Sequence, residues 1–185
     1  MIRQATIEDA EQVMPLVLSA IGSIAYSLAG TPDDAETMRI LTDFYRKKGN
    51  RISYENVVVE ERDGLVAGMA IVYDGSRAEE LDQPFLDRIH AEKGIAGYTI
   101  AREPRQDEYY LDSIAVYDSY QGQGIAKGLM AAFEAKAMKH GHSKLSLIVE
   151  QDNDRAFALY GKMGYAEDGS LQVGGSLFRR MVKLI

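Results

Sequence analysis

The feature that most constrains the fold lies in residues 109–140, where a strand pattern, a turn with two glycines and a helix pattern follow one another directly. Residues 109–116 are rich in aromatic and β-branched side chains, which favours a buried strand. Gly122 and Gly124 allow backbone N–H groups to converge where a side chain would block their approach. The helix expected to follow, up to His140, would direct its unpaired N–H groups and its positive dipole end at this turn. Such a unit commonly binds an anion, usually a phosphate.

Neither of the two best-known phosphate-binding motifs fits this turn. The dinucleotide-binding fingerprint requires a small residue three positions after its second glycine, and Lys127 occupies that position here. The P-loop requires a Gly-Lys-Ser/Thr triplet, which the chain lacks. What remains is the pattern Gln121-x-x-Gly124-x-Ala126. A tight turn without a ligand stays the alternative interpretation when this pattern is taken alone.

Strand and helix patterns alternate along the rest of the chain. Thr6 and Asp9 resemble a capping box before a helix, in which Pro15 should produce a kink or displace the helix start. Asp63-Gly64 indicates a hairpin turn. Strands between helices predict an α/β fold, with a mixed sheet whose faces the helices cover. An alternating stretch is expected at 2–5, further strands at 57–59, 65–73, 144–149 and 176–184, and further helices at 31–48, 84–90 and 154–163.

The composition is that of an ordinary globular protein, with 185 residues of which 46% are apolar and 26% charged. We expect a single domain over residues 1–185, because no linker or repeat is visible. The absence of cysteine excludes disulfides, thiolate metal sites and a cysteine nucleophile. No apolar run approaches the roughly 20 residues that span a bilayer, and the first residues lack an apolar leader segment. These features predict a cytoplasmic protein with no membrane partner.

The charge is distributed unevenly. The net charge is −7, and residues 1–111 carry 20 acids and 12 bases, whereas residues 112–185 carry 8 acids and 9 bases. A broad nucleic-acid surface needs clustered Lys and Arg, so a nucleic-acid partner is not expected. An acidic half favours a cationic substrate through its electric field, although a solvated acidic surface without any partner is the alternative.

Two motifs in order resemble those of the GNAT superfamily of acyl-CoA-dependent N-acetyltransferases. The pattern Gln121-x-x-Gly124-x-Ala126 is similar to the loop that binds the coenzyme A pyrophosphate in that superfamily. Residues 153–160, Asn-Asp-Arg-Ala-Phe-Ala-Leu-Tyr, followed by Gly-Tyr at 164–165, are similar to its second motif. The opening residues 2–9 resemble its first strand and helix. The resemblance therefore extends over most of the chain.

This resemblance implies a mixed, mostly antiparallel central sheet of about six to seven strands, flanked by helices and splayed at the acyl-CoA site. It implies acetyl-CoA as a co-substrate and no metal. Main-chain groups around Val116 would bind the pantetheine and polarise the thioester. The implied cofactor-binding residues are Ile114, Ala115, Val116, Gln121, Gly122, Gln123, Gly124, Ile125, Ala126, Lys127, Asn153 and Tyr160.

The implied reaction is direct attack of a primary amine on the thioester, without an acyl-enzyme. Tyr160 is the predicted general acid for the coenzyme A thiolate, because a phenol with a pKa near 10 can protonate a thiolate held beside it. A core tyrosine on an amphipathic helix is the alternative reading of Tyr160. Asn153 can cap the helix that follows it or bind the pantetheine amides.

The general base is less well marked. Some members of the superfamily carry a glutamate at the positions that Tyr110 and Ile148 occupy here. Asp112 should share a sheet face with Tyr110, because alternate residues of a strand point the same way, and it is the predicted second catalytic residue. Glu60 and Glu108 are further options, and the amine can also lose its proton to bulk water.

The acceptor is expected to be a small-molecule or protein amine, cationic by the charge argument, and the chain is either a monomer or a homodimer. Residues 74–108 exceed the length of a simple connection, so they are expected to be an insertion near the acceptor site that determines the substrate. The alternative function is an acyl-CoA-binding regulatory module without turnover. Tyr110 and Ile148 at the two base positions support that alternative, whereas Tyr160 argues against it. A third reading, an interaction protein with a degenerate loop, requires both motifs to be coincidental.

Overall fold

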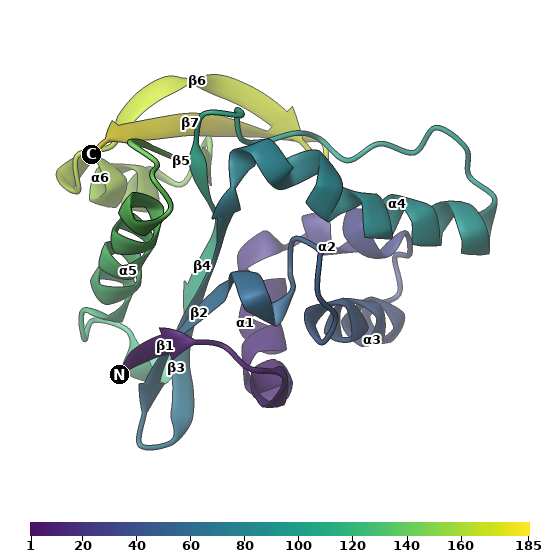
Figure 1. Ribbon diagram of the computed structural model, residues 1–185, viewed down its shortest axis with the longest axis horizontal. Helices are drawn as coiled ribbons and strands as arrows, with labels where there is room; N and C mark the ends of the chain where they lie inside the picture. The colour runs from purple at the N-terminus through teal and green to yellow at the C-terminus, as the bar shows by residue number, and fades with distance from the viewer.

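In the computed structural model, which describes residues 1–185, a single seven-stranded sheet runs through the molecule and helices lie on both of its faces (Figure 1). The strand order is β1-β2-β3-β4-β5-β7-β6, and every neighbouring pair is antiparallel except β4 and β5. This is the mixed, mostly antiparallel sheet that the resemblance implies. The strands are β1 Ile2–Gln4, β2 Val57–Arg62, β3 Leu65–Asp74, β4 Tyr109–Val116, β5 Lys144–Glu150, β6 Ala166–Val173 and β7 Ser176–Leu184.

The one parallel pair opens part of the way along its length. Three residue pairs join β4 to β5, and the last of them is Leu111 with Leu147. Beyond this pair β4 continues to Val116 beside β3, and β5 continues to Glu150 beside β7. The two strands therefore diverge in the middle of the sheet, as the resemblance implies.

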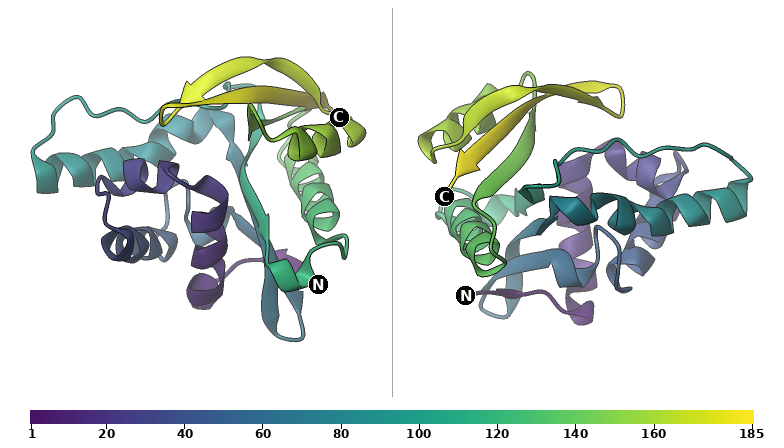
Figure 2. Two further views of the ribbon diagram at one scale, coloured as in Figure 1. Left: turned by 180° about the vertical axis from the view of Figure 1, so that it is seen from behind. Right: turned by 45° about the horizontal axis from the view of Figure 1, so that its top comes forward.

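Helices cover the two faces of the sheet unequally (Figure 2). One face carries α1, which contacts β3 and β4 and packs in turn against α2 and α3, and the opposite face carries α5 over β2, β3 and β4. Each face has its own buried apolar core. No helix is long and apolar enough to cross a membrane. The helices are α1 Ala10–Ile21, α2 Ile24–Ala29, α3 Asp34–Tyr45, α4 Ala78–Lys93, α5 Ile125–Lys139 and α6 Asp154–Lys162.

Two local motifs form as predicted. The carboxylate of Asp9 accepts hydrogen bonds from the N–H of Thr6 at 2.8 Å and from its hydroxyl at 3.2 Å, just before α1. Asp63 and Gly64 adopt φ angles of 51° and 78° between β2 and β3. Positive φ at both central positions is what a tight hairpin turn with the twist of a sheet requires.

Of the two effects predicted for Pro15, a displaced helix start does not occur, because Pro15 lies inside α1, which begins at Ala10. The helices of the N-terminal half differ from the prediction in two places. A separate short helix, α2, follows Gly22 and was not predicted. The next helix begins after Asp33, whose side chain accepts from the N–H of Glu36 at 2.7 Å, so the predicted start at Thr31-Pro32 was wrong.

Residues 74–108 contain more helix than predicted. α4 runs over 16 residues, Ala78–Lys93, with Pro84 inside it, rather than over the short segment expected at 84–90. The chain then returns to β4 through an irregular segment, in which the Tyr98 hydroxyl donates to the carbonyl of Ser27 at 2.8 Å. This contact ties the segment to α2.

Candidate active site

The glycine turn and the free end of β4 form one groove of about 410 Å³. Its wall is made by three elements that the sequence motifs also mark: the last part of β4, the turn with the start of α5, and α6. The groove is lined by Ile114, Ala115, Val116, Tyr120, Gln121, Gly122, Gly124, Ile125, Ala126, Lys127, Arg155, Leu159 and Tyr160.

The turn presents unpaired N–H groups to this groove. Gly122 and Gly124 have φ angles of 76° and 80°, and a Cβ at either position would meet no atom within 4 Å. The first hydrogen bond of α5 is donated by Gly128 to the carbonyl of Gly124 at 3.1 Å, so the N–H groups of residues 125–127 have no helical partner. Lys127 adds a positive charge, and the arrangement fits an anionic ligand such as a pyrophosphate.

The two glutamines of the turn stabilise its shape. The side-chain amide of Gln121 donates to the carboxylate of Asp118 at 2.8 Å, and that of Gln123 donates to the carbonyl of Ser119 at 3.2 Å. Both side chains therefore bond back to the preceding 3₁₀ helix, Asp118–Tyr120. Gln123 does not line the groove, although its main chain belongs to the turn.

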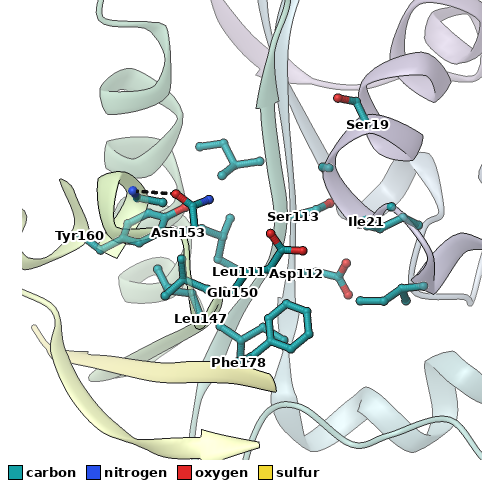
Figure 3. Close-up of a pocket in the computed structure, with 17 residues that line it drawn as sticks. Ser19, Ile21, Leu111, Asp112, Ser113, Leu147, Glu150, Asn153, Tyr160 and Phe178 are labelled. Carbon is teal, nitrogen blue, oxygen red and sulfur yellow. Dashed lines mark hydrogen bonds between the residues drawn. The ribbon is translucent and has the colours of Figure 1, made fainter. Parts of the chain in front are cut away.

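A second cavity of about 340 Å³ lies where β4 and β5 diverge (Figure 3). Its walls come from the end of α1 with the turn to α2, from β4 and β5, from the start of α6, and from Phe178 of β7. Ile114 and Tyr160 line both this cavity and the first groove. The two spaces therefore meet at these residues, between the free half of β4 and α6.

Tyr160 stands at this meeting point with a free hydroxyl. α6 carries it, and Asn153 caps that helix by accepting from the N–H of Ala156 at 3.0 Å. The Tyr160 hydroxyl makes no hydrogen bond within the chain, and burial raises its pKa to about 12. The Tyr160 ring packs edge-on against Tyr165, with 6.1 Å between ring centroids. The phenol is thus held in place and stays protonated near neutral pH.

Asp112 lies on a β-bulge that turns it into the second cavity. Between β3 and β4, Ile71 is opposite Ser113 and Val72 is opposite Leu111, so Asp112 is the extra residue. A bulge re-aims side chains and breaks strict alternation. Asp112 and Ser113 consequently both line the second cavity (Figure 3).

A buried guanidinium holds one oxygen of Asp112. Oδ2 accepts from Nε and Nη2 of Arg51 at 2.9 and 2.5 Å, and from the Tyr73 hydroxyl at 2.9 Å. Oδ1 accepts no hydrogen bond from the chain, and the Asp112 side chain is only 4% exposed. The three donors thus fix one oxygen of Asp112 and leave the other available.

Arg51 also pairs with two further buried carboxylates, and together these residues form a cluster of one cation and three acids. Its Nη2 lies 2.8 Å from Glu103, and its Nη1 lies 3.4 Å from Asp82. Burial raises the pKa of Asp82 to about 6, with Arg51 acting against this shift and the neighbouring acids adding to it. Burial also raises the pKa of Glu103, which accepts from the Tyr110 hydroxyl. One cation thus faces three buried acids.

The other residues weighed as bases are spread over the molecule. Ile148 lines the second cavity, whereas the Tyr110 side chain is buried in the core around α1. Glu60 pairs with the N-terminal ammonium and with Arg62. Glu108 is fully buried and pairs with Arg180 and Lys144. Glu60 and Glu108 line neither of the two cavities.

The structure adds residues that the motifs did not indicate. Glu150, at the end of β5, is exposed and lines the second cavity, which the buried carboxylate of Asp112 also lines (Figure 3). Arg155 contributes a second cation to the first groove. No local pattern connects Arg51 to the cavity, because its partners lie far away in the chain.

Known proteins with similar sequences are acetyltransferases. The family model described as the acetyltransferase (GNAT) family matches residues 31–165. An acetyltransferase of Yersinia pestis (strain Pestoides F) is 33% identical over 73 residues, which are 40% of this chain and 50% of that protein. The chain spans about half the length of the curated relatives that it first matches.

Solved structures of the same fold agree with this match. The crystal structure of an acetyltransferase has a TM-score of 0.81 at 28% identity, and the alignment covers 100% of this chain and 99% of that one. The PaiA N-acetyltransferase of Thermoplasma acidophilum, solved in complex with coenzyme A, shares the fold at a TM-score of 0.57 and 17% identity, covering 100% and 98% of the two chains. The family match includes the glycine turn, the divergent strands and α6. This chain belongs to the acetyltransferase (GNAT) family.

Proposed function

We propose that this protein transfers an acetyl group from acetyl-CoA to a primary amine. The observation that carries the proposal is the junction of two spaces at Ile114 and Tyr160. One space has the unpaired N–H groups and cations that suit a pyrophosphate, and the other has carboxylates that suit an amine. Direct transfer needs the thioester and the amine to meet at one point, and this junction supplies one.

The residues of the first groove fit the coenzyme A part of the donor, which supplies the activated acetyl group. The N–H groups of residues 122–127 would bind the pyrophosphate, and Lys127 and Arg155 would offset its charge. The main chain of residues 114–116 borders the same groove along the free half of β4. There it would hold the pantetheine and direct an N–H at the thioester carbonyl.

Tyr160 is the proposed general acid. As the amine nitrogen forms a bond to the acetyl carbon, the carbon–sulfur bond breaks and the sulfur needs a proton. The phenol at the junction would donate it, because a pKa of about 12 keeps it protonated at neutral pH and it has no competing acceptor in the chain. The amine loses a proton in the same reaction, so the overall proton count is unchanged.

The acids of the second cavity receive different proposed roles. Asp112, predicted as catalytic, has one oxygen occupied by Arg51 and Tyr73 and the other without a hydrogen-bond donor, so the free oxygen can accept from a bound ammonium. Glu150 is exposed at the end of β5 and can pass a proton directly to solvent. We propose Asp112 as an anchor for the acceptor and Glu150, or water, as the proton acceptor.

The segment 74–108 is proposed to shape the acceptor. Residues 95–101 and Glu103 line a further pocket of about 490 Å³, together with Leu28 and Arg51. Arg51 and Glu103 also line a small cavity of about 70 Å³ that shares Asp112 with the second cavity. The segment thus borders the space that continues from Asp112.

The proposed function is tested by thiol release from acetyl-CoA across a panel of primary amines. Release that depends on a particular amine is the expected result. An acyl-CoA-binding module without turnover is the second candidate, which the sequence leaves open through Tyr110 and Ile148. Acetyl-CoA binding without thiol release for any amine would favour that candidate.

A further inference from the structure

We infer that the acceptor is a short aliphatic diamine, whose second amino group binds as an ammonium between Asp112 and Ser113 while the first reacts beside Tyr160. This inference rests on the proposed function and names its substrate class. It is carried by the shape of the second cavity, by two polar groups without partners, and by an uncompensated buried charge.

The two ends of the second cavity have different neighbours. At one end, Ile114 and Tyr160 border the groove of the donor. At the other end, Asp112 borders the small inner cavity of about 70 Å³, which neither Ile114 nor Tyr160 lines. A molecule that reacts at Tyr160 therefore extends toward Asp112. Ile114 follows Asp112 by two positions on β4, which corresponds to roughly 7 Å at about 3.3 Å per residue.

Two polar groups of neighbouring β4 residues that line the second cavity have no partner. Oδ1 of Asp112 accepts no hydrogen bond, because all three donors around this carboxylate bind Oδ2. The Ser113 hydroxyl is also unpaired, although Ser113 is only 7% exposed. A buried hydroxyl without a partner costs free energy, so it indicates a missing ligand group. An ammonium has three hydrogens and can donate to both groups.

The charge at this end has the sign that attracts a cation. Arg51 is the one cation that pairs with the carboxylates of Asp82, Glu103 and Asp112. Three buried acids against one guanidinium leave an excess of negative charge, which burial makes costly. The raised pKa values of Asp82 and Glu103 show this cost. A second ammonium would offset part of it.

Part of the wall of the second cavity is apolar, and Ser19, Glu150 and Asn153 add polar groups to it. The side chains of Ile21, Ile24, Ile148 and Phe178 line both the second cavity and the inner cavity. A chain of methylene groups would pack against them, whereas a polar linker would lose its hydration without replacement. This apolar stretch of wall, with an anion at its far end, matches an alkyl diamine.

The test measures the activity of the wild-type protein toward three acceptors of equal chain length. Diaminobutane carries the second ammonium, aminobutanol replaces it with a neutral hydroxyl, and butylamine ends in a methyl group. We expect kcat/KM for diaminobutane to exceed that for the other two by about 10- to 100-fold, as for a hydrogen bond to a charged group. Equal kcat/KM for the three acceptors would overturn the inference while leaving the proposed function intact.

Two variants locate the effect. Ser113→Ala removes only the unpaired hydroxyl, and we expect it to reduce the preference for diaminobutane over butylamine by about tenfold. Asp112→Asn should abolish the preference, and Ser113→Ala keeps the test decisive if Asp112→Asn does not fold. The matched control is Tyr165→Phe, which deletes another buried unpaired hydroxyl that lines neither cavity. A general structural defect would lower the rates for both amines equally and would leave their ratio unchanged.

Calorimetry separates failure of this inference from failure of the proposed function. Diaminobutane and butylamine are titrated into the protein saturated with coenzyme A, so no turnover is needed. Tighter binding of diaminobutane that weakens in Ser113→Ala supports the inference even if no amine is acetylated. Equal binding of both amines, or a diaminobutane preference that Ser113→Ala leaves unchanged, would overturn it.

Discussion

Arg51 and Asp112 lie 61 residues apart in the chain, and their side chains meet at 2.5 Å where the second cavity adjoins the small inner cavity. Arg51 comes from the segment before β2, and Asp112 from the bulge of β4. Their pairing joins the N-terminal half of the chain to the divergent strands. The second cavity therefore depends on a buried ion-pair network as well as on apolar packing.

Removing Arg51 should destabilise the protein strongly. Arg51→Met leaves three carboxylates buried without their cation, and breaking a buried pair typically costs about 3–5 kcal/mol. The matched control is Arg39→Met, because Arg39 pairs with Asp43 on the exposed side of α3 at 3.6 Å. That control should change the free energy of unfolding by less than about 1 kcal/mol. Urea unfolding at pH 7 measures the free energy of unfolding of both variants. Equal losses in the two would contradict a stabilising role for the cluster around Arg51.

The same cluster predicts a dependence of stability on pH. Burial raises the pKa of Asp82 in the folded protein to about 6, from an ordinary value of 3.8. The folded state then binds a proton more tightly than the unfolded state, so this contribution to stability is present at low pH. It is lost as the pH rises from about 4 through 6.

Asp82→Asn should remove this dependence. Relative to the wild type, the variant should gain about 2–3 kcal/mol between pH 4 and pH 7, at 1.4 kcal/mol per pKa unit. Urea unfolding at a series of pH values measures the difference. Asp87→Asn, on the exposed side of the same helix, is the control and should give a curve parallel to the wild type. A parallel curve for Asp82→Asn itself would contradict the assigned shift.

Acetyl-CoA binding should depend on the open space above Gly124. Gly124 and Gly141 both have a φ angle of 80° and no atom within 4 Å of a Cβ position, but only Gly124 lines the donor groove. Gly124→Val and Gly141→Val should therefore lose similar stability through backbone strain. At about 100 times its Kd, acetyl-CoA should stabilise the wild type and Gly141→Val by about 2.7 kcal/mol. Thermal denaturation with and without acetyl-CoA tests this, and an undiminished shift in Gly124→Val would refute the site.

Features that depend on neighbouring residues could be predicted from the sequence. The turn at Asp63-Gly64, the capping box at Thr6 and the two motifs each need only a few consecutive residues, and their conformations follow from those residues. β6 was missed because its pattern, Ala-Glu-Asp-Gly-Ser-Leu-Gln-Val, is mostly exposed and does not alternate. Its conformation depends on pairing with β7 along the edge of the sheet.

The predicted cofactor residues could be found from local sequence, whereas the second cavity could not. All of the predicted cofactor residues except Gln123 and Asn153 line the donor groove, because they lie in two short motifs and the strand beside them. The second cavity is assembled from α1, β4, β5 and β7, which meet only in the folded chain. The bulge at Asp112 depends on the register with β3. No local pattern specifies that register.

The rate of acetylation of a cationic amine, at limiting amine, should fall as the salt concentration rises. Residues 1–111 carry 20 acids against 12 bases, so their field attracts a cation over a distance. The Debye length falls to about 8 Å at physiological ionic strength, which screens this attraction. We expect kcat/KM for the amine to fall between low and physiological salt, measured at saturating acetyl-CoA. A preferred acceptor that is neutral or anionic, or a rate independent of salt, would contradict the cationic acceptor.

Tyr160→Phe tests the general acid most directly. The change deletes the hydroxyl and keeps the ring, so the edge-on packing against Tyr165 should survive. Loss of a general acid typically lowers kcat by about 10²- to 10⁴-fold, and thiol release with the preferred amine should fall in this range. The Kd of acetyl-CoA should change little, because the main chain of residues 122–127 provides the pyrophosphate contacts.

The pH profile provides a second readout for Tyr160. Burial raises the pKa of Tyr160 to about 12, so the wild-type phenol should remain a proton donor, and its ionisation should cause no loss of rate up to pH 10. Tyr165→Phe is the control, since it removes a neighbouring hydroxyl that lines neither cavity. If Tyr160→Phe retains kcat within about threefold of the wild type, water is the proton source and Tyr160 only fills the junction between the two cavities.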